Sequence, residues 1–278
     1  MSRQEPPVHQ ARKRFGQNFL HDAGVIDRIV RAIGPKPDDN LLEIGPGMGA
    51  LTESLLVNNP SLTVLELDRD LVPGLRTQFF NYPEFTVLQG DALRFDYAEL
   101  TRDKPLRIVG NLPYNISTPL IFHLLSYADR IHDMHFMLQK EVVQRMAAVP
   151  GDSQWGRLAV MTQYQCQVQP LFPVGSGAFR PAPKVDSAIV RLMPYDTPPM
   201  PAMDRDLLAK VVRTAFSARR KTLRKALAVL FNDRDWPELG IDPGLRPQNL
   251  TLADFVAMAD YLYHKPLENR ANETGSPP

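Results

Sequence analysis

Cysteine is nearly absent from this sequence, with Cys166 the only one among 278 residues. A single thiol cannot form a disulfide within the chain, which excludes the disulfide-stapled folds of small secreted proteins. No apolar run approaches the roughly 18 residues of a membrane-spanning helix, and the polar, basic N-terminus has no apolar signal region. We therefore expect a cytoplasmic protein that does not enter a membrane.

The sequence also has almost no net charge, because 32 basic residues offset 31 acidic ones and leave a formal charge of +1. Proteins that bind nucleic acid concentrate positive charge, so this average alone argues against such a partner. The distribution is uneven, however. Residues 1–14 carry a net charge of +3, and residues 210–225 carry +7 with no acidic residue, whereas the other 248 residues sum to −9.

These two basic segments are candidate phosphate-binding surfaces. A charge run is most often a solvated helix face, but such faces normally mix both signs, so contact with phosphate is favoured for the second segment. A disordered basic N-terminus is a common feature, and the first segment is expected only to add to the surface. The candidate RNA-binding residues are Arg12, Lys13, Arg14, Arg219, Arg220, Lys221, Arg224 and Lys225.

Histidine is sparse as well, and of the six in the chain only His132 and His135 lie close together. On a strand, side chains three residues apart point to opposite faces, so this pair cannot grip one ion. We expect no metal site, and we expect Cys166 to be a small core residue.

The fold class follows from alternating patterns, from residue 40 onward, of short apolar runs and segments with helical periodicity. This alternation predicts a doubly wound α/β fold with a mostly parallel sheet. The expected strands are 40–44, 62–67, 85–88, 106–109 and 134–138, and the expected helices between them include 51–57, 70–80 and 119–125.

The second half of the chain departs from this alternation. After a helix at 158–165, the runs 166–171 and 187–193 have no helix between them, so they are expected to pair antiparallel at one edge of the sheet. Four prolines between 194 and 201 then mark a boundary, followed only by helical patterns at 207–216, 222–230 and 252–263. We therefore expect a first domain over 1–197, a small all-helical domain over 202–264 and a disordered tail over 265–278.

A glycine-rich turn follows the first of these strands. Gly45, Gly47 and Ala50 match G-x-G-x-x-A, and Glu66 and Asp91 follow the next two strands, over the same crevice. The motif alone also suits a dinucleotide-binding protein or a merely tight turn. A carboxylate after each strand could hold a ribose hydroxyl and an adenine amino group, and no histidine or lysine stands ready for hydride chemistry. This arrangement resembles the class I S-adenosylmethionine-dependent methyltransferases.

After the fourth strand comes the tetrapeptide Asn111-Leu112-Pro113-Tyr114. Asparagine and proline often build ordinary turns. The tetrapeptide also suits the methylation of an exocyclic amine on a base, whose lone pair is delocalised into the ring. The side-chain oxygen of Asn111 and the carbonyl of Leu112 could accept both amino hydrogens, while Pro113 fixes the turn and Tyr114 stacks on the base.

Four sequence blocks carry a more specific likeness, which runs from about residue 11 to about residue 262. The chain resembles the rRNA adenine N6,N6-dimethyltransferase family and, within it, the small-subunit type. The blocks are KRFGQNFL at 13–20, LPYNISTP at 112–119, QKEV at 139–142 and FRPAPKVDS at 179–187.

The resemblance implies a class I fold with a seven-stranded, mostly parallel sheet and a small helical C-terminal domain that binds RNA. It also implies transfer of methyl groups from S-adenosylmethionine to two adjacent adenosines near the 3′ end of 16S rRNA, late in the assembly of the small subunit. The products would be S-adenosylhomocysteine and N6,N6-dimethyladenosine. The partner is then the rRNA of an immature small subunit, and we expect a monomer.

The family's functional positions carry over to residues of this chain one at a time. The implied cofactor-binding residues are Asn18, Leu20, Gly45, Gly47, Glu66, Asp91 and Asn111. Tyr114 and Phe179 match the two aromatic residues that would sandwich the target base. Pro181 and Pro183 follow Phe179 and predict an extended loop, where a core ring is less expected.

Three rival interpretations remain open. The nearest is the large-subunit rRNA dimethyltransferase type linked to macrolide resistance, which shares the tetrapeptide; Leu112 and residues 15–17 favour the small-subunit type. A non-catalytic ribosome-assembly factor is the second rival, although the intact Glu66, Asp91 and Asn111 argue for catalysis. An NAD-dependent enzyme is a distant third.

Overall fold

The computed structural model describes residues 18–101 and 104–265. It divides into two compact units, the first formed by residues up to 144 together with 166–195, and the second by 145–165 together with the residues from 196 onward. The expected domain boundary after residue 197 lies close to residue 196, where the chain enters the second unit for the second time. That unit also includes residues 145–165, which the expected domain limits assigned to the first domain. None of the described helices is long and apolar enough to cross a membrane.

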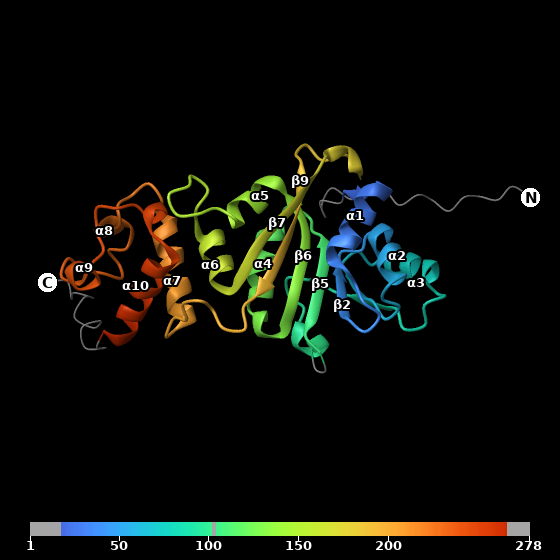
Figure 1. Cartoon of the computed structure of the whole chain (residues 1–278), viewed down its shortest axis with the longest axis horizontal. Helices are drawn as coiled ribbons and strands as arrows, with labels where there is room; N and C mark the ends of the chain where they lie inside the picture. The colour runs from blue at the N-terminus through green and yellow to red at the C-terminus, as the bar shows by residue number, and fades with distance from the viewer. Residues whose placement is uncertain (1–17, 102–103, 266–278) are drawn as a thin grey trace, which may run out of the picture. The chain divides into compact units, whose positions relative to one another are not determined.

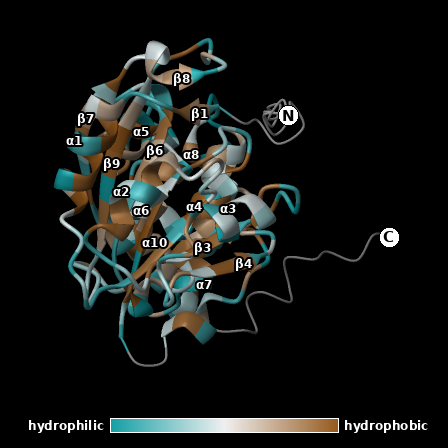
Figure 2. Cartoon of the chain, turned by 90° about the vertical axis from the view of Figure 1, so that its right-hand side faces the viewer, coloured by the Kyte–Doolittle hydropathy of each residue, from teal (hydrophilic) through white to brown (hydrophobic). Residues whose placement is uncertain are grey.

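The first unit is built on a seven-stranded sheet of order β4-β3-β2-β5-β6-β9-β7. Strands β4 to β6 in this order are parallel, and β9 and β7 pair antiparallel at the edge, as expected. The strands are β2 (Asn40–Ile44), β3 (Thr63–Glu66), β4 (Thr86–Gln89), β5 (Leu106–Asn111), β6 (Ile131–Gln139), β7 (Cys166–Val174) and β9 (Ser187–Pro194). Figure 1 shows β2, β5 and β6 side by side, and Figure 2 shows the apolar character of strands such as β3 and β9.

The strand order positions the site. From β2 the chain winds outward to β3 and β4 and then returns to β5 on the other side of β2. In an open parallel sheet, ligands bind at such a switch point, beyond the carboxyl ends of the strands. The glycine turn after β2 and the tetrapeptide at the end of β5 therefore belong to the same edge of the sheet.

Helices cover the sheet. They are α1 (Ala23–Ile33), α2 (Ala50–Leu56), α3 (Val72–Gln78), α4 (Ser117–Leu125) and α5 (Lys140–Met146), and α5 passes from the first unit into the second. The helix α1 goes beyond the sequence-based expectations. Asp22 caps its N-terminus, Gly34 ends it in the left-handed region, and it buries Ile26, Ile29 and Ile33 in the core.

A second, two-stranded sheet lies in the same unit. It joins β1 (Phe19–Leu20) to β8 (Phe179–Arg180) in antiparallel register. No sequence pattern predicts strands of two residues. The pair matters because it joins the end of the KRFGQNFL block to the start of the FRPAPKVDS block: Leu20 pairs with Phe179, 159 residues later in the sequence.

The helical unit contains α6 (Arg157–Gln165), α7 (Arg205–Ser217), α8 (Leu223–Ala226), α9 (Asp235–Leu239) and α10 (Leu252–His264). Within it α7 packs on α6 and α10, and the side chain of Gln163 binds the carbonyls of Met146 and Ala148. These contacts join residues 145–165 to the unit. The helix expected over 222–230 is shorter, because α8 ends at Ala226 and turns occupy the next residues.

A buried charge network fixes the middle of the sheet. Arg107 in β5 binds both carboxylate oxygens of Asp133 in β6, at 2.9 and 3.0 Å, and binds Asp39 at 2.6 Å. Arg191 in β9 reaches the same Asp133 at 3.2 Å. Burial alone would raise the pKa of Asp133, but the hydrogen bonds and charge of Arg107 hold this pKa below its usual value. The network joins β5, which carries the tetrapeptide, to β6 and, through Asp133, to β9, and it also ties β5 to the residue before β2.

His135 lies beside this network and is 3% exposed. Burial lowers its pKa to about 4. Because the pKa is lower in the folded than in the unfolded protein, the contribution of His135 to stability is complete above pH 6.5 and is lost as the pH falls toward 4. We predict that this group alone lowers the free energy of unfolding by about 3 kcal/mol over that interval, and that His135→Gln removes this part of the pH dependence in urea titrations.

The exposed His132 on the same strand provides the control. His132→Gln should keep the wild-type pH dependence. A wild-type slope in His135→Gln would contradict the prediction.

Candidate active site

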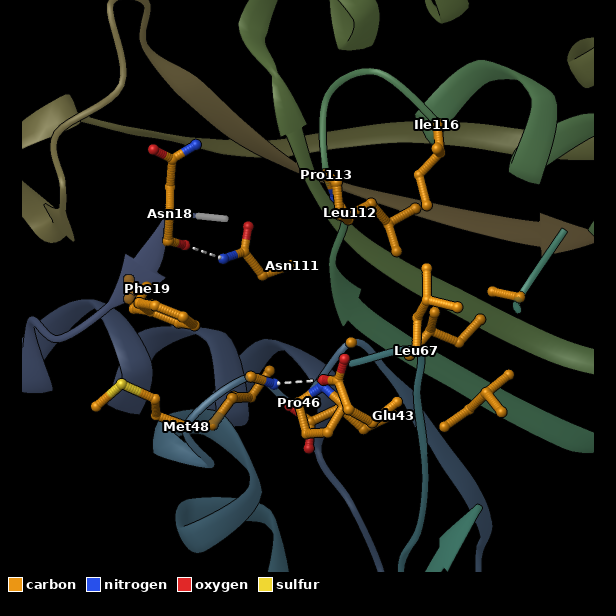
Figure 3. Close-up of a pocket in the computed structure, with 18 of the residues that line it drawn as sticks. Asn18, Phe19, Glu43, Pro46, Met48, Leu67, Asn111, Leu112, Pro113 and Ile116 are labelled. Carbon is orange, nitrogen blue, oxygen red and sulfur yellow. Dashed lines mark hydrogen bonds between the residues drawn. The ribbon is translucent and has the colours of Figure 1, made fainter. Parts of the chain in front are cut away.

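A cavity of about 300 Å³ opens at the switch point of the first unit. This size suits a small organic cofactor, and most of the wall is apolar with a few polar groups. Ten of the residues predicted from the sequence line it: Asn18, Leu20, Gly45, Gly47, Glu66, Asp91, Asn111, Leu112, Pro113 and Tyr114. Figure 3 shows the cavity between the glycine turn and the tetrapeptide.

The glycine turn forms the floor of the cavity. Its three glycines, Gly45, Gly47 and Gly49, have positive φ between 59° and 82°. At Gly47 a Cβ would also come within 3.1 Å of the Phe19 ring, so a side chain would be both strained and crowded there. The turn thus requires glycine and lets a ligand approach the backbone.

Glu66 ends β3 and points at this turn. One carboxylate oxygen accepts the Gly47 N–H at 3.2 Å, and the other accepts the Asp68 N–H at 2.8 Å. Burial raises the pKa of Glu66, and these backbone hydrogen bonds oppose that effect. The carboxylate is held in one orientation at the cavity wall, with lone pairs left for a ligand hydroxyl.

Asp91 follows β4 and is more exposed. One oxygen accepts the Leu93 N–H at 3.0 Å and so shapes the local turn, and the other lies 3.9 Å from Nε of Arg94. The residue therefore serves the turn, as any aspartate there would, while its side chain also lines the cavity.

Asn111 is oriented by a long-range hydrogen bond. Its amide nitrogen donates to the carbonyl of Asn18 at 3.0 Å, which turns the amide oxygen away from Asn18 (Figure 3). The preceding Gly110 is needed for packing, because a Cβ there would lie 2.6 Å from the carbonyl oxygen of Ile44 in β2. The N–H of the next residue, Leu112, donates to Met137 in β6 at 3.2 Å.

Two hydroxyl groups hold the other end of the tetrapeptide. Ser117 donates to the carbonyl of Tyr114 at 3.1 Å, and the Tyr114 hydroxyl lies 2.7 Å from the hydroxyl of Ser187. The main effect on the Tyr114 pKa is burial, which raises it. The Pro113 carbonyl accepts the N–H of Ile116 at 3.1 Å, so every residue of the tetrapeptide forms a hydrogen bond with another residue.

Glu43 is a site residue beyond those predicted. It stands two positions before Gly45, lines the cavity and is 2% exposed. Burial raises its pKa to about 8, although Thr52 donates a hydrogen bond of 2.6 Å to the carboxylate. An acid at the end of a wholly buried strand was the signal in the sequence, because a core position seldom keeps an acid.

Phe179 requires a correction. The prolines after it predict an extended loop and make a core ring the less expected alternative, but Phe179 lies in β8, is 2% exposed and belongs to the hydrophobic core. The strand pair with β1 places it opposite Leu20 and turns its ring inward. It does not line the cavity in this structure, and its contact with a base stays a prediction.

The basic segment of the helical unit is not uniform. Arg219 is half-buried and donates hydrogen bonds to the carbonyls of Ser153 and Trp155. Arg224 lies 3.4 Å from Asp233. Arg220, Lys221 and Lys225 are exposed. The other basic candidates, Arg12, Lys13 and Arg14, lie outside the described residues.

Comparison with known proteins identifies the family to which this chain belongs. A family model described as "Ribosomal RNA adenine dimethylase" matches residues 8–264. The chain belongs to the ribosomal RNA adenine dimethylase family. It is 69% identical to Ribosomal RNA small subunit methyltransferase A of Marinobacter nauticus over 254 residues, which cover 91% of this chain and 92% of that relative.

Two solved structures agree with this assignment. A dimethyladenosine transferase from Plasmodium falciparum is 30% identical, with a TM-score of 0.72 over 86% of this dimethylase and 95% of that chain. The 23S rRNA methyltransferase ErmE is 26% identical, with a TM-score of 0.68 over 89% and 100%. The expected class I methyltransferase fold is therefore confirmed. Membership of the dimethylase family excludes the rival interpretation as an NAD-dependent enzyme.

The residues of the dimethylase cavity fit S-adenosylmethionine. The glycine turn leaves room for a ligand beside the backbone, and the two carboxylates of Glu66 and Asp91 can accept hydrogen bonds from hydroxyl and amino groups. Within the described part of the chain, no cluster of histidine, cysteine and acidic residues could hold a metal ion.

The raised pKa of Glu43 makes the stability of the protein depend on pH. Its pKa is higher in the folded than in the unfolded protein, so the cost of burying it grows as the pH rises from about 4.5 to 8. We predict that Glu43→Gln is more stable than the wild type, by a margin that grows over this interval to roughly 4 kcal/mol, in urea unfolding followed by circular dichroism.

The control is Glu53→Gln, at an exposed position of α2. It should follow the wild type at each pH. A constant difference between Glu43→Gln and wild type would show that Glu43 is ionised in the folded protein.

Proposed function

We propose that this dimethylase transfers methyl groups from S-adenosylmethionine to the N6 amino groups of two adjacent adenosines near the 3′ end of 16S rRNA, within an immature small subunit. The identity of 69% to a relative named as a small-subunit methyltransferase, over nearly the whole of both chains, carries the choice of substrate. A second such relative, from Hahella chejuensis, is 62% identical over 264 residues.

The cofactor is proposed to lie between the glycine turn and the tetrapeptide. Asn18, Leu20 and Gly45 would contact it through the cavity wall, Glu66 would accept hydrogen bonds from the ribose hydroxyls, and Asp91 from the adenine amino group. When bound, S-adenosylmethionine supplies a methyl group on a positively charged sulfur. Glu43 lies in the same wall; with a pKa of about 8 it is mostly protonated at neutral pH, and a cationic ligand nearby would favour its ionised form.

The tetrapeptide is proposed to orient the amine. The amide nitrogen of Asn111 is occupied by the Asn18 carbonyl, so its amide oxygen is the group left to accept an amino hydrogen. The Leu112 carbonyl would accept the other. With both hydrogens held, the nitrogen lone pair is directed at the methyl group, and orientation supplies most of the rate. The ring of Tyr114 would stack on the base, with Phe179 as its proposed partner on the other side.

We propose that the helical unit, residues 202–264 in particular, grips the rRNA backbone. Folded RNA is recognised largely by shape and phosphate contact, and the target adenosine would be flipped out of its stack into the cavity. The exposed Arg220, Lys221 and Lys225 suit phosphate contact best. Arg219 already binds two carbonyls of its own unit and would instead support the surface. We propose further that the protein acts as a cytoplasmic monomer.

The large-subunit activity is the second candidate, because ErmE shares the fold over its full length. It is disfavoured by an identity of 26%, against 69% for the small-subunit relative. The deciding assay measures tritiated methyl transfer into immature small subunits and into protein-free large-subunit rRNA. Transfer only into the latter would overturn the proposal, and binding of small subunits without transfer would favour an assembly factor.

In the same assay we predict that Asn111→Ala lowers the rate of methyl transfer by at least about 100-fold, because the amino group loses one acceptor. The Kd of S-adenosylmethionine, measured by calorimetry, should rise less than about 10-fold. Asn58→Ala replaces an exposed asparagine of the same unit and should retain full activity. Wild-type turnover by Asn111→Ala would refute the acceptor role.

For the RNA-binding surface, we predict that Arg220→Ala combined with Lys221→Ala weakens binding to small subunits. The slope of log Kd against log salt concentration should become shallower by about 1 for each lost phosphate contact. Cofactor affinity should stay unchanged. Arg234→Ala removes an exposed arginine outside the basic segment and serves as the control. Subunit affinity equal to wild type would exclude this surface.

A further inference from the structure

Ser187 is the last residue of the FRPAPKVDS block and the first of β9. Its hydroxyl lies 2.7 Å from the Tyr114 hydroxyl, the usual distance of a strong O–H···O hydrogen bond. Ser187 is 0% exposed. Sequence reasoning gives this serine no role of its own beyond its place in the FRPAPKVDS block.

The backbone of Ser187 is held on both sides. It pairs with Gln139 at the end of β6 and with Val174 at the end of β7. The carbonyl of the preceding Asp186 accepts the N–H of Lys140 at 2.9 Å. A buried side chain on a strand paired on both sides has little freedom to move, so its hydroxyl is a fixed point.

Tyr114 reaches this fixed point from another strand. The tetrapeptide leaves β5, and β6 lies between β5 and β9 in the sheet. The Tyr114 side chain therefore spans the end of β6 to meet Ser187. Its backbone is held separately, by Ser117 at its carbonyl. The tyrosine is anchored at both ends, so the axis of the ring, from Cβ to the hydroxyl oxygen, is held in one direction.

We propose that Ser187 is a positioning residue for methyl transfer, whose hydroxyl fixes the position of the Tyr114 ring on which the target adenine stacks. The inference rests on the proposed function. A stacked base takes its tilt from the ring beneath it, and the tilt decides whether the amine meets the methyl group in line. Ser187 is not among the residues that line the cavity, so it would act through Tyr114.

The geometry also explains why three separate blocks occur together. LPYNISTP supplies the ring, FRPAPKVDS supplies the hydroxyl that holds it, and QKEV supplies Gln139 and Lys140, which pair with the strand start that bears Ser187. Each block is needed for the same ring position.

A merely structural role would predict a loss of stability with no effect on the ring or on turnover. The first measurement therefore follows the ring itself. In protein labelled with 13C at the tyrosine rings, the Tyr114 signal is identified among eight tyrosines by its absence in Tyr114→Phe. We expect the NMR order parameter of the Tyr114 ring carbons to fall by about 0.2 or more in Ser187→Ala, because the ring axis loses its anchor at the hydroxyl, at unchanged cofactor affinity.

The second measurement is kinetic. Ser187→Ala and Tyr114→Phe remove the same hydrogen bond from opposite ends, and each should lower kcat about 10-fold with little change in KM for small subunits. The double variant should be no slower than the slower single variant, whereas independent effects would multiply to about 100-fold. Thr101→Ala, which loses a half-buried hydroxyl bound to Ala98, controls for the loss of a hydroxyl as such.

Wild-type kcat in Ser187→Ala, or multiplying effects in the double variant, would overturn the proposal. If Ser187→Ala fails to fold, Tyr114→Phe still tests the bond from its other end: wild-type kcat there overturns the proposal, and the expected loss supports it. Absence of methyl transfer by the wild type would overturn the proposed function instead, and an unchanged order parameter of the Tyr114 ring in Ser187→Ala would separately show that Ser187 does not hold the ring.

Discussion

The close approach of β2 and β5 is the constraint on which the site depends. These neighbouring strands carry the glycine turn and the tetrapeptide, and they are so close that a Cβ at Gly110 would lie 2.6 Å from the carbonyl oxygen of Ile44. Because both strands are parallel, their carboxyl ends meet at one edge. The buried Arg107 and Asp133 pair β5 with β6 by charge as well as by backbone hydrogen bonds, so the strand that presents Asn111 is fixed from both sides.

Catalysis by orientation needs such rigidity, since the amine requires no strong base. The tetrapeptide is held by contacts with Asn18, Met137 and Ser187, which come from three different parts of the chain. The cavity wall holds groups that lower stability instead. Glu43 is buried with its pKa raised to about 8, and Glu66 is raised as well. Buried acids with raised pKa values are typical of binding sites, which are retained for function although they lower the stability of the folded protein.

Sequence spacing predicted those parts of the molecule that are set by neighbours along the chain. The seven main strands, the antiparallel edge and the ten cavity residues all follow local patterns or intact blocks. What it missed depends on contacts between distant residues. Two-residue strands such as β1 and β8 have no periodicity, so the pattern after Phe179 predicted a loop where the β1 pairing creates a core position. The same holds for Ser187, whose partner is 73 residues away.

The small net charge gains a structural meaning from the side-chain contacts. Arg107 forms ion pairs with Asp39 and Asp133 in the sheet-containing unit, and Arg219 binds two carbonyls within the helical unit. Arginine suits such internal roles because its planar group forms several hydrogen bonds at once. A count of basic residues therefore overstates the charge that faces a partner. In the segment 219–225, Arg220, Lys221 and Lys225 are exposed and have the charge that the proposed phosphate contact requires; phosphate contacts position a protein but carry no sequence information, so under this proposal the choice of base falls to the cavity.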